Sequence, residues 1–187
     1  MMNKINSVCV YCASSTKIDS VYFDAARELG TLLGQRQIRL INGAGNMGLM
    51  SAVSDAALRA GGEVTGVIPR FMVEQGWHHT GLTQLVEVES MHQRKKTMAD
   101  LSDAVIALPG GCGTLEELLE IITRTVSEPD CDTECQELFR PSARYAPAGG
   151  GRKLHAYAAR CHLACGADTA GSRGTDIYHS IVGRLHP

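Results

Sequence analysis

Residues 104–120 read AVIALPGGCGTLEELLE, and this stretch decides the fold. Its apolar beginning is typical of a buried strand, its glycines of a tight turn, and the spacing of its apolar residues from 114 onward of a helix. Such a turn lets backbone amides approach an anion, and the helix N-terminus favours negative charge. We therefore predict a phosphate site formed by Gly110, Gly111, Gly113 and the hydroxyl of Thr114.

The same order of strand, polar or glycine-rich turn and helix recurs upstream. Strands are expected at residues 8–13, 38–41, 64–69, 85–88 and 104–108, and helices at 21–32, 49–60, 91–102 and 114–123. Because strands and helices alternate, the sequence predicts an α/β fold with a Rossmann-like, doubly wound parallel sheet.

The turns that follow parallel strands meet at one edge of the sheet, where ligands bind. We therefore expect Ser14, after the first strand, and Gly43 and Gly45, after the second, to contact the same ligand as the 110–114 turn. For either glycine-rich turn alone, glycines that merely permit a tight bend explain the sequence equally well. Two such turns at one edge favour a ligand.

Charge and composition limit the class of protein. Eighteen Lys and Arg against 20 Asp and Glu give a net charge of -2, so no overall basic field is present to gather nucleic acid or an anionic membrane. No segment approaches the roughly 18 consecutive apolar residues of a membrane span. The N-terminal residues lack a signal-peptide pattern, and the seven cysteines are an odd number. We expect a cytoplasmic protein with reduced thiols.

The composition changes sharply after residue 123. Ile, Leu, Val and Phe make up 33 of the first 123 residues but only 9 of the last 64, too few for a packed core. We predict a nucleotide-binding core over residues 1–123 and a weakly ordered tail over 124–187. A zinc site is an alternative use of the tail's Cys131, Cys135, His155, Cys161, His162 and Cys165, but their spacing fits zinc motifs loosely, and no metal is expected.

Two motifs resemble those of a known family. PGGCGTLEE, residues 109–117, matches the PGGxGTxxE signature of the Lonely Guy family, also labelled lysine decarboxylase-like, and MHQRK, residues 91–95, resembles its Met-x-x-Arg-Lys signature. VCVYCASS and INGAGNMGLM resemble the family's first two strand and turn units. The resemblance covers about residues 7–123.

The resemblance implies an enzyme that hydrolyses cytokinin riboside 5'-monophosphates, or related purine nucleotides such as AMP, to free base and ribose 5-phosphate. It implies Arg94 and Glu117 as the catalytic pair, Lys95 near the phosphate, a homodimer and no cofactor. A decarboxylase would need a cofactor such as pyridoxal phosphate on a lysine, and no lysine lies in a suitable motif.

The chemistry of N-glycoside cleavage suits these residue types. Positive charge develops on the ribose ring, and the Glu117 carboxylate can stabilise it, hold ribose hydroxyls or position water. The Arg94 guanidinium suits a phosphate, or the orientation of Glu117 and the leaving base. Non-catalytic alternatives are that Glu117 merely complements the helix dipole and that Arg94 belongs to a solvated charge run.

The tail has an unusual relation to the resemblance. The family continues with a Trp, a Gln-Leu-Gly segment, a strand and a helix, none of which is present. A codon frame shifted forward by one base from Thr123 permits a continuous string that includes the strand PIVILNV and the helices FDPLLAMLQRAVEENF and TPQEAVELI. We interpret the tail as out of frame from about Thr123 or Arg124. The family's C-terminal strand and helices are thus missing or replaced. Two alternatives to the enzyme follow: a nucleotide-binding carrier without catalysis, and an inactive frameshifted product.

Overall fold

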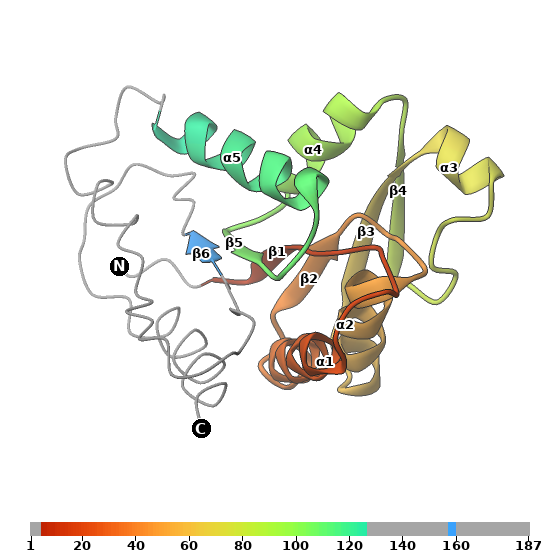
Figure 1. The fold of residues 1–187 in the computed structure, drawn as a ribbon, viewed down its shortest axis with the longest axis vertical. Helices are drawn as coiled ribbons and strands as arrows, with labels where there is room; N and C mark the ends of the chain where they lie inside the picture. Colours follow the sequence, from red (N-terminus) through yellow and green to blue (C-terminus); the bar gives the residue numbers. More distant parts are fainter. Residues whose placement is uncertain (1–4, 127–156, 160–187) are drawn as a thin grey trace.

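The computed structural model describes residues 5–126 and 157–159, so most of the predicted tail lies outside the described residues. Six strands form one sheet in the order β4-β3-β2-β1-β5-β6 (Figure 1). Their bounds are β1 Ser7–Tyr11, β2 Arg39–Asn42, β3 Val64–Pro69, β4 Gln84–Val88, β5 Ala104–Ala107 and β6 Tyr157–Ala159.

The first five strands are parallel, which confirms the predicted α/β, Rossmann-like sheet. Strand β1 is central: β2, β3 and β4 extend the sheet on one side, and β5 pairs with β1 on the other. The order of the strands therefore reverses at β1, and ligands of such sheets bind at the carboxyl ends beside the reversal.

Strand β6 was not expected. Tyr157–Ala159 pairs antiparallel with β5 and forms the edge of the sheet, although no strand period is evident in the sequence after residue 123. A run of three residues is too short to carry a strand period, so nothing in the sequence marks it.

Helices cover both faces of the sheet. Figure 1 shows α1 (Ser20–Gln35) and α2 (Gly48–Arg59) on one face, and α4 (Met91–Asp100) and α5 (Cys112–Val126) on the other. A short helix, α3 (Arg70–Glu74), follows β3 and was not expected. None of the helices described has the length and apolar character needed to span a membrane.

Local signals explain two of the helix starts. The Asp19 side chain accepts a hydrogen bond from the Val21 amide at the start of α1, and the Ser90 hydroxyl accepts one from the Gln93 amide at the start of α4. Helix α5 begins at Cys112, two residues before the predicted start, so Thr114 lies in its first turn.

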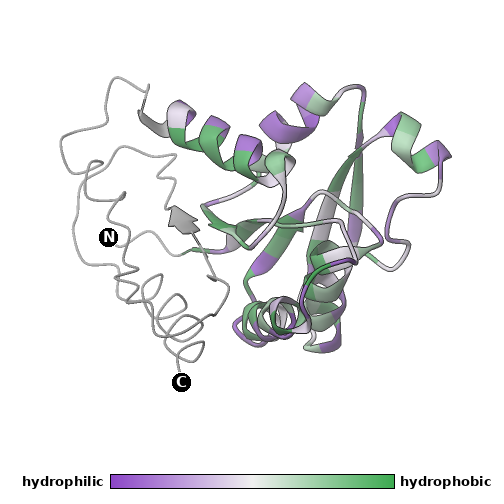
Figure 2. Cartoon of the chain, viewed as in Figure 1, coloured by the Kyte–Doolittle hydropathy of each residue, from purple (hydrophilic) through white to green (hydrophobic). Residues whose placement is uncertain are grey.

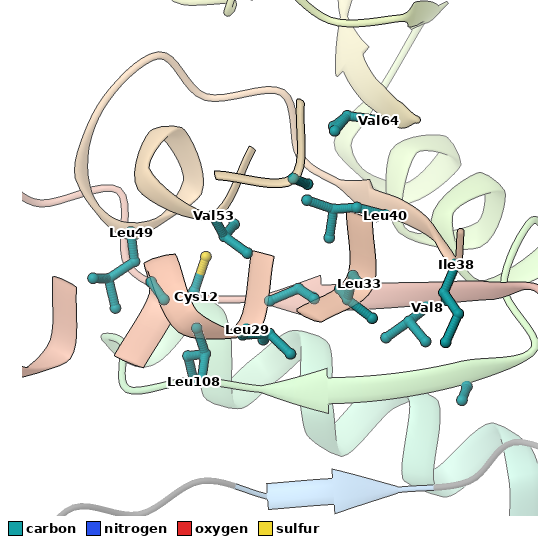
Figure 3. Packing of buried hydrophobic residues seen from close by; sticks show 14 of the residues in the cluster. Val8, Cys12, Leu29, Leu33, Ile38, Leu40, Leu49, Val53, Val64 and Leu108 are labelled. Atoms are coloured by element: carbon teal, nitrogen blue, oxygen red, sulfur yellow. The ribbon is translucent and has the colours of Figure 1, made fainter. Parts of the chain in front are cut away.

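Each face of the sheet has its own core. Between the sheet and α1 and α2, the cluster includes Leu29, Leu33, Leu40 and Val53 (Figure 3). The second cluster packs α4 and α5 on the opposite face and includes Met98 and Leu118. Figure 2 shows mostly hydrophobic strands between helices that carry both hydrophobic and hydrophilic residues. The two cores hold the strands whose ends form the candidate site.

Candidate active site

Backbone hydrogen bonds join three loops at the carboxyl edge of the sheet. The Ala13 amide, after β1, donates to the carbonyl of Pro109 at 3.2 Å, and the Leu49 amide, in α2, donates to the carbonyl of Ala13 at 2.9 Å. Gly48 has a φ of +65° and no Cβ, and a Cβ there would lie 2.5 Å from the carbonyl carbon of Ser14. This close approach fixes the first loop, with the exposed Ser14, against the start of α2.

The turn after β5 packs tightly on one side and is open on the other. A Cβ on Gly110 would lie 2.1 Å from Oγ1 of Thr114, so the missing side chain leaves the space that the Thr114 hydroxyl occupies. A Cβ on Gly111 or Gly113 would meet nothing within 4 Å. The open side of the turn leaves room for a ligand beside the N-terminus of α5.

Arg94 of α4 is buried rather than part of a solvated charge run. Its Nε donates to the carbonyl of Val67 in β3 and its Nη2 to the carbonyl of Gly43 after β2, both at 3.0 Å. A Cβ on Gly43 would lie 1.7 Å from Nη2, so the guanidinium requires a glycine at this position. Two of its three nitrogens are thus committed to backbone carbonyls, and the side chain has one fixed orientation.

The third nitrogen of Arg94, Nη1, lies 3.8 Å from Oε1 of Glu117. The Glu117 side chain is 13% exposed. Burial raises the pKa of Glu117, and the positive charge of Arg94 offsets part of that rise. The helix dipole acts most strongly on carboxylates in the first turn of a helix. Because α5 begins at Cys112, Glu117 lies beyond that turn. Complementing that dipole therefore does not explain its position.

Lys95, the neighbour of Arg94, points to different partners. Its ammonium contacts the carboxylates of Glu116 and Glu120 on α5, and these hydrogen bonds, that to Glu116 first, raise the pKa of Lys95. Lys95 and Glu116 therefore form a second charged contact between α4 and α5, next to that of Arg94 and Glu117. The predicted contact of Lys95 with a phosphate stays a prediction.

The loop after β2 contains a residue that sequence reasoning missed. Asn42 is fully buried, accepts a hydrogen bond from the Ala44 amide at 2.9 Å and donates one to Oγ of Ser54 at 2.8 Å. Gly45 forms an isolated antiparallel bridge with His78. An asparagine before glycine is an ordinary turn signal, so the sequence alone does not reveal its buried contacts.

The predicted site residues thus lie in several neighbouring places. Arg94, Glu117 and Gly43 lie together, and Gly110, Gly111, Gly113 and Thr114 form the turn that begins the helix of Glu117. Ser14 and Gly45 lie in the two neighbouring loops, whereas the Lys95 ammonium is bound to α5.

The described residues contain no group of three or more His, Cys, Asp or Glu side chains that could hold a metal. The cysteines and histidines of the alternative zinc site lie outside them. Among the described cysteines, Cys9 and Cys12 are buried and Cys112 is exposed, and all three are free thiols.

Comparison with known proteins adds independent information. The chain is 48% identical over 121 residues to the cytokinin riboside 5'-monophosphate phosphoribohydrolase LOG1 of Arabidopsis thaliana, covering 65% of this chain and 57% of that protein. It is 48% identical over 122 residues to the probable cytokinin riboside 5'-monophosphate phosphoribohydrolase LOGL9 of Oryza sativa subsp. japonica, covering 64% and 53%. The chain therefore spans little more than half the length of these curated relatives.

Solved structures share the fold. A target of the Northeast Structural Genomics Consortium matches with a TM-score of 0.57 and 26% identity, over 64% of this chain and 70% of that one. The molybdenum cofactor carrier protein of Chlamydomonas reinhardtii matches with a TM-score of 0.57 and 20% identity, over 65% and 73%. At such low identity the second likeness concerns the fold alone.

A family model described as "Possible lysine decarboxylase" matches residues 50–132. This segment includes Arg94, Glu117 and the glycine-rich turn between them. Over these residues, which make up less than half of the chain, the sequence matches the Lonely Guy, or lysine decarboxylase-like, family.

Proposed function

We propose that this protein hydrolyses the N-glycosidic bond of a nucleoside 5'-monophosphate, either a cytokinin riboside 5'-monophosphate or a related purine nucleotide such as AMP. The contact of the buried Arg94 with the mostly buried Glu117, beside the 109–114 turn, carries the proposal. The curated relatives, named as cytokinin riboside 5'-monophosphate phosphoribohydrolases, support this choice of substrate class.

The reaction needs positive charge to be stabilised on the ribose. The bond between C1' and the base nitrogen breaks, and its electron pair leaves with the base. A water oxygen bonds to C1'; one of the water's protons passes to the base, and the other stays on the new C1' hydroxyl. A carboxylate at Glu117 stabilises the ring charge and can hold the attacking water. The products are the free base and ribose 5-phosphate.

The geometry supports an orienting role for Arg94. Because Nε and Nη2 donate to backbone carbonyls, Nη1 is the nitrogen left to face Glu117. A guanidinium fixed in this way holds the carboxylate in one place and keeps its charge close to the reacting atoms. In this proposal the phosphate is bound by the 110–114 turn instead.

We also propose that the chain acts as a homodimer in the cytoplasm. Leu115 and Leu119 of α5 are more than half exposed, and Met91 and Leu101, in and just after α4, are also exposed. Large apolar side chains in such positions favour contact with another protein surface. Light scattering should give a dimer mass for the wild type and a monomer mass for Leu119→Glu; a monomeric wild type contradicts the dimer.

The activity is tested by measuring free base released from AMP and from N6-isopentenyladenosine 5'-monophosphate, with the unphosphorylated nucleosides as comparison. We expect release from the monophosphates only, because the turn binds the phosphate. Glu117→Gln should lower turnover on the order of 10²-fold while nucleotide binding, measured by calorimetry, changes little. The matched control is Glu116→Gln, one residue away, which should keep most of the turnover.

The outcomes separate the alternatives. Undiminished turnover in Glu117→Gln contradicts the mechanism. Tight nucleotide binding without release of base in the wild type supports a carrier. A third outcome is that a variant with the restored reading frame releases base and the present chain does not. The altered tail would then be the cause of the lost activity.

A further inference from the structure

One peptide group lies between Asn42 and the proposed catalytic pair. The amide of Ala44 donates to Oδ1 of Asn42 at 2.9 Å, and the carbonyl of Gly43 accepts from Nη2 of Arg94 at 3.0 Å. Both atoms belong to the peptide that joins residues 43 and 44. A peptide group is planar, with its N–H and C=O pointing in opposite directions, so fixing the N–H fixes the C=O.

The orientation of the Asn42 side chain is itself determined by its partners. The Ala44 amide is a donor and requires an oxygen, so Oδ1 faces it and Nδ2 faces Ser54. Asn42 and Ser54 are both buried, so neither can exchange these hydrogen bonds for water. The side chain therefore keeps a single orientation.

The backbone conformation of Ala44 favours rotation of the 43–44 peptide. Its φ of +57° lies in the left-handed region, which a residue with a Cβ adopts at a cost. Rotation of the 43–44 peptide would let φ of Ala44 become negative, and it would also turn the Gly43 carbonyl away from Arg94. The hydrogen bond to Oδ1 of Asn42 opposes this rotation.

Surrounding contacts depend on the same conformation. The Ala44 carbonyl accepts a hydrogen bond from the His79 amide at 2.8 Å. The Ala44 methyl lies over Gly66 in β3, where a Cβ would come within 2.5 Å of it. The left-handed Ala44 thus fits the fold, and Asn42 supplies the bond that holds the preceding peptide.

We propose that Asn42 is a positioning residue for Arg94, and through Arg94 for Glu117. It does not touch the reacting atoms; it sets the direction of the Gly43 carbonyl that holds the guanidinium. The consequence for turnover rests on the proposed function, whereas the effect on Arg94 does not.

The direct test follows the Nε–H of Arg94 by NMR in the full chain, with its resonance assigned by its loss in Arg94→Lys. In the wild type this proton should exchange slowly with solvent. Asn42→Ala should accelerate its exchange at least about tenfold. The Gly43 carbonyl can then turn away from Nη2, and a guanidinium that has lost this anchor breaks its bond from Nε to the Val67 carbonyl more often. Adding Ala44→Gly should restore much of the protection, because glycine adopts a positive φ without the cost of a Cβ.

The control is Val53→Ala, which removes buried volume from α2 without touching the 43–44 peptide. It should lower thermal stability and leave the exchange of the Arg94 Nε–H unchanged. Unchanged exchange in Asn42→Ala, equal acceleration in Val53→Ala, or no rescue by Ala44→Gly would each overturn the proposal.

Turnover provides a separate readout. Asn42→Ala should lower kcat by roughly 10²-fold with little change in KM, since a displaced catalytic pair slows the chemical step while the phosphate turn still binds. Ala44→Gly should recover kcat in the double variant. A wild type that releases no base contradicts the proposed function, and the exchange measurement still decides the role of Asn42.

Discussion

Glu117 is subject to two opposing influences, since burial raises its pKa and Arg94 lowers it, with burial the larger. A carboxyl whose pKa is raised on folding binds protons more tightly in the folded than in the unfolded state, so stability falls as pH rises through the folded pKa. We therefore expect Glu117→Gln to melt at a higher temperature than the wild type at neutral pH. The difference should shrink as pH falls through the raised pKa of Glu117 and should be gone below the ordinary Glu pKa of 4.5.

Melting curves of both proteins across the acid range measure this effect. Glu116→Gln is the matched control: Glu116 is largely exposed, so replacing its carboxylate relieves no burial cost. A wild type that is more stable than Glu117→Gln at neutral pH would show that Arg94, rather than burial, dominates the environment of the carboxyl.

Gly43 supports the same pair by having no side chain. Gly43→Ala places a Cβ 1.7 Å from Nη2 of Arg94, so the guanidinium must leave its position. We expect turnover to fall on the order of 10²-fold, the usual effect of misplacing a catalytic group by about 1 Å. Gly81→Ala is the control, because a Cβ there meets only the ring of His79, at 3.2 Å. Normal turnover in Gly43→Ala would show that the position of Arg94 is not needed.

Among the secondary-structure elements, α1 and α2 make the closest contact. A Cβ on Gly30 of α1 would lie 2.3 Å from the carbonyl oxygen of Val53 in α2, so the helices approach backbone to backbone. Gly30→Ala should destabilise the fold by about 1–3 kcal/mol, the usual cost of overpacking. Chemical denaturation measures this, and Gln35→Ala, at an exposed position of α1, should change stability by less than about 0.5 kcal/mol. Equal effects of both substitutions would mean that the helices can move apart freely.

Helices α4 and α5 are joined by charged contacts that differ in their exposure to solvent. Arg94 is buried and the Glu117 side chain is only 13% exposed, whereas Asp100 of α4 and Arg124 of α5 form a pair whose side chains are 40% and 36% exposed. Salt screens exposed pairs far more than buried ones. The geometry of the proposed site therefore depends little on ionic strength, even where the surface pairs of the same helices weaken.

At the scale of the whole molecule, periodicity was enough to predict the five parallel strands and their covering helices. It missed α3 and β6, because five and three residues are too few to show a period. MHQRK is polar and typical of a surface segment, so only the resemblance indicated Arg94. The buried position of Arg94 depends on two carbonyls, one in β3 and one just after β2. The contacts of Asn42 depend on tertiary packing that no local pattern encodes.

The content of Ile, Leu, Val and Phe falls sharply near residue 123, which divides the chain into two parts. We expect resequencing of the source DNA across the codons for residues 121–126 to show that the neighbouring frame encodes the strand NPIVILN. The physical reason is that this frame supplies the apolar strand and amphipathic helix that the present tail lacks. A neighbouring frame without that strand would make the tail a genuine appendage, and a zinc titration of its four cysteines would then be the next measurement.

The pairing of β1 with β5 has a consequence for synthesis on the ribosome. Val8 of β1 pairs with Ala104 of β5. The central strand β1 therefore gains its neighbour β5 only after nearly a hundred further residues have been synthesised. Contacts of such long sequence separation form late in folding. Yet both members of the pair, Arg94 and Glu117, and all five parallel strands are translated before the codon of Arg124. A nascent chain therefore carries every residue of the proposed site before the point, near residue 123, at which its composition changes.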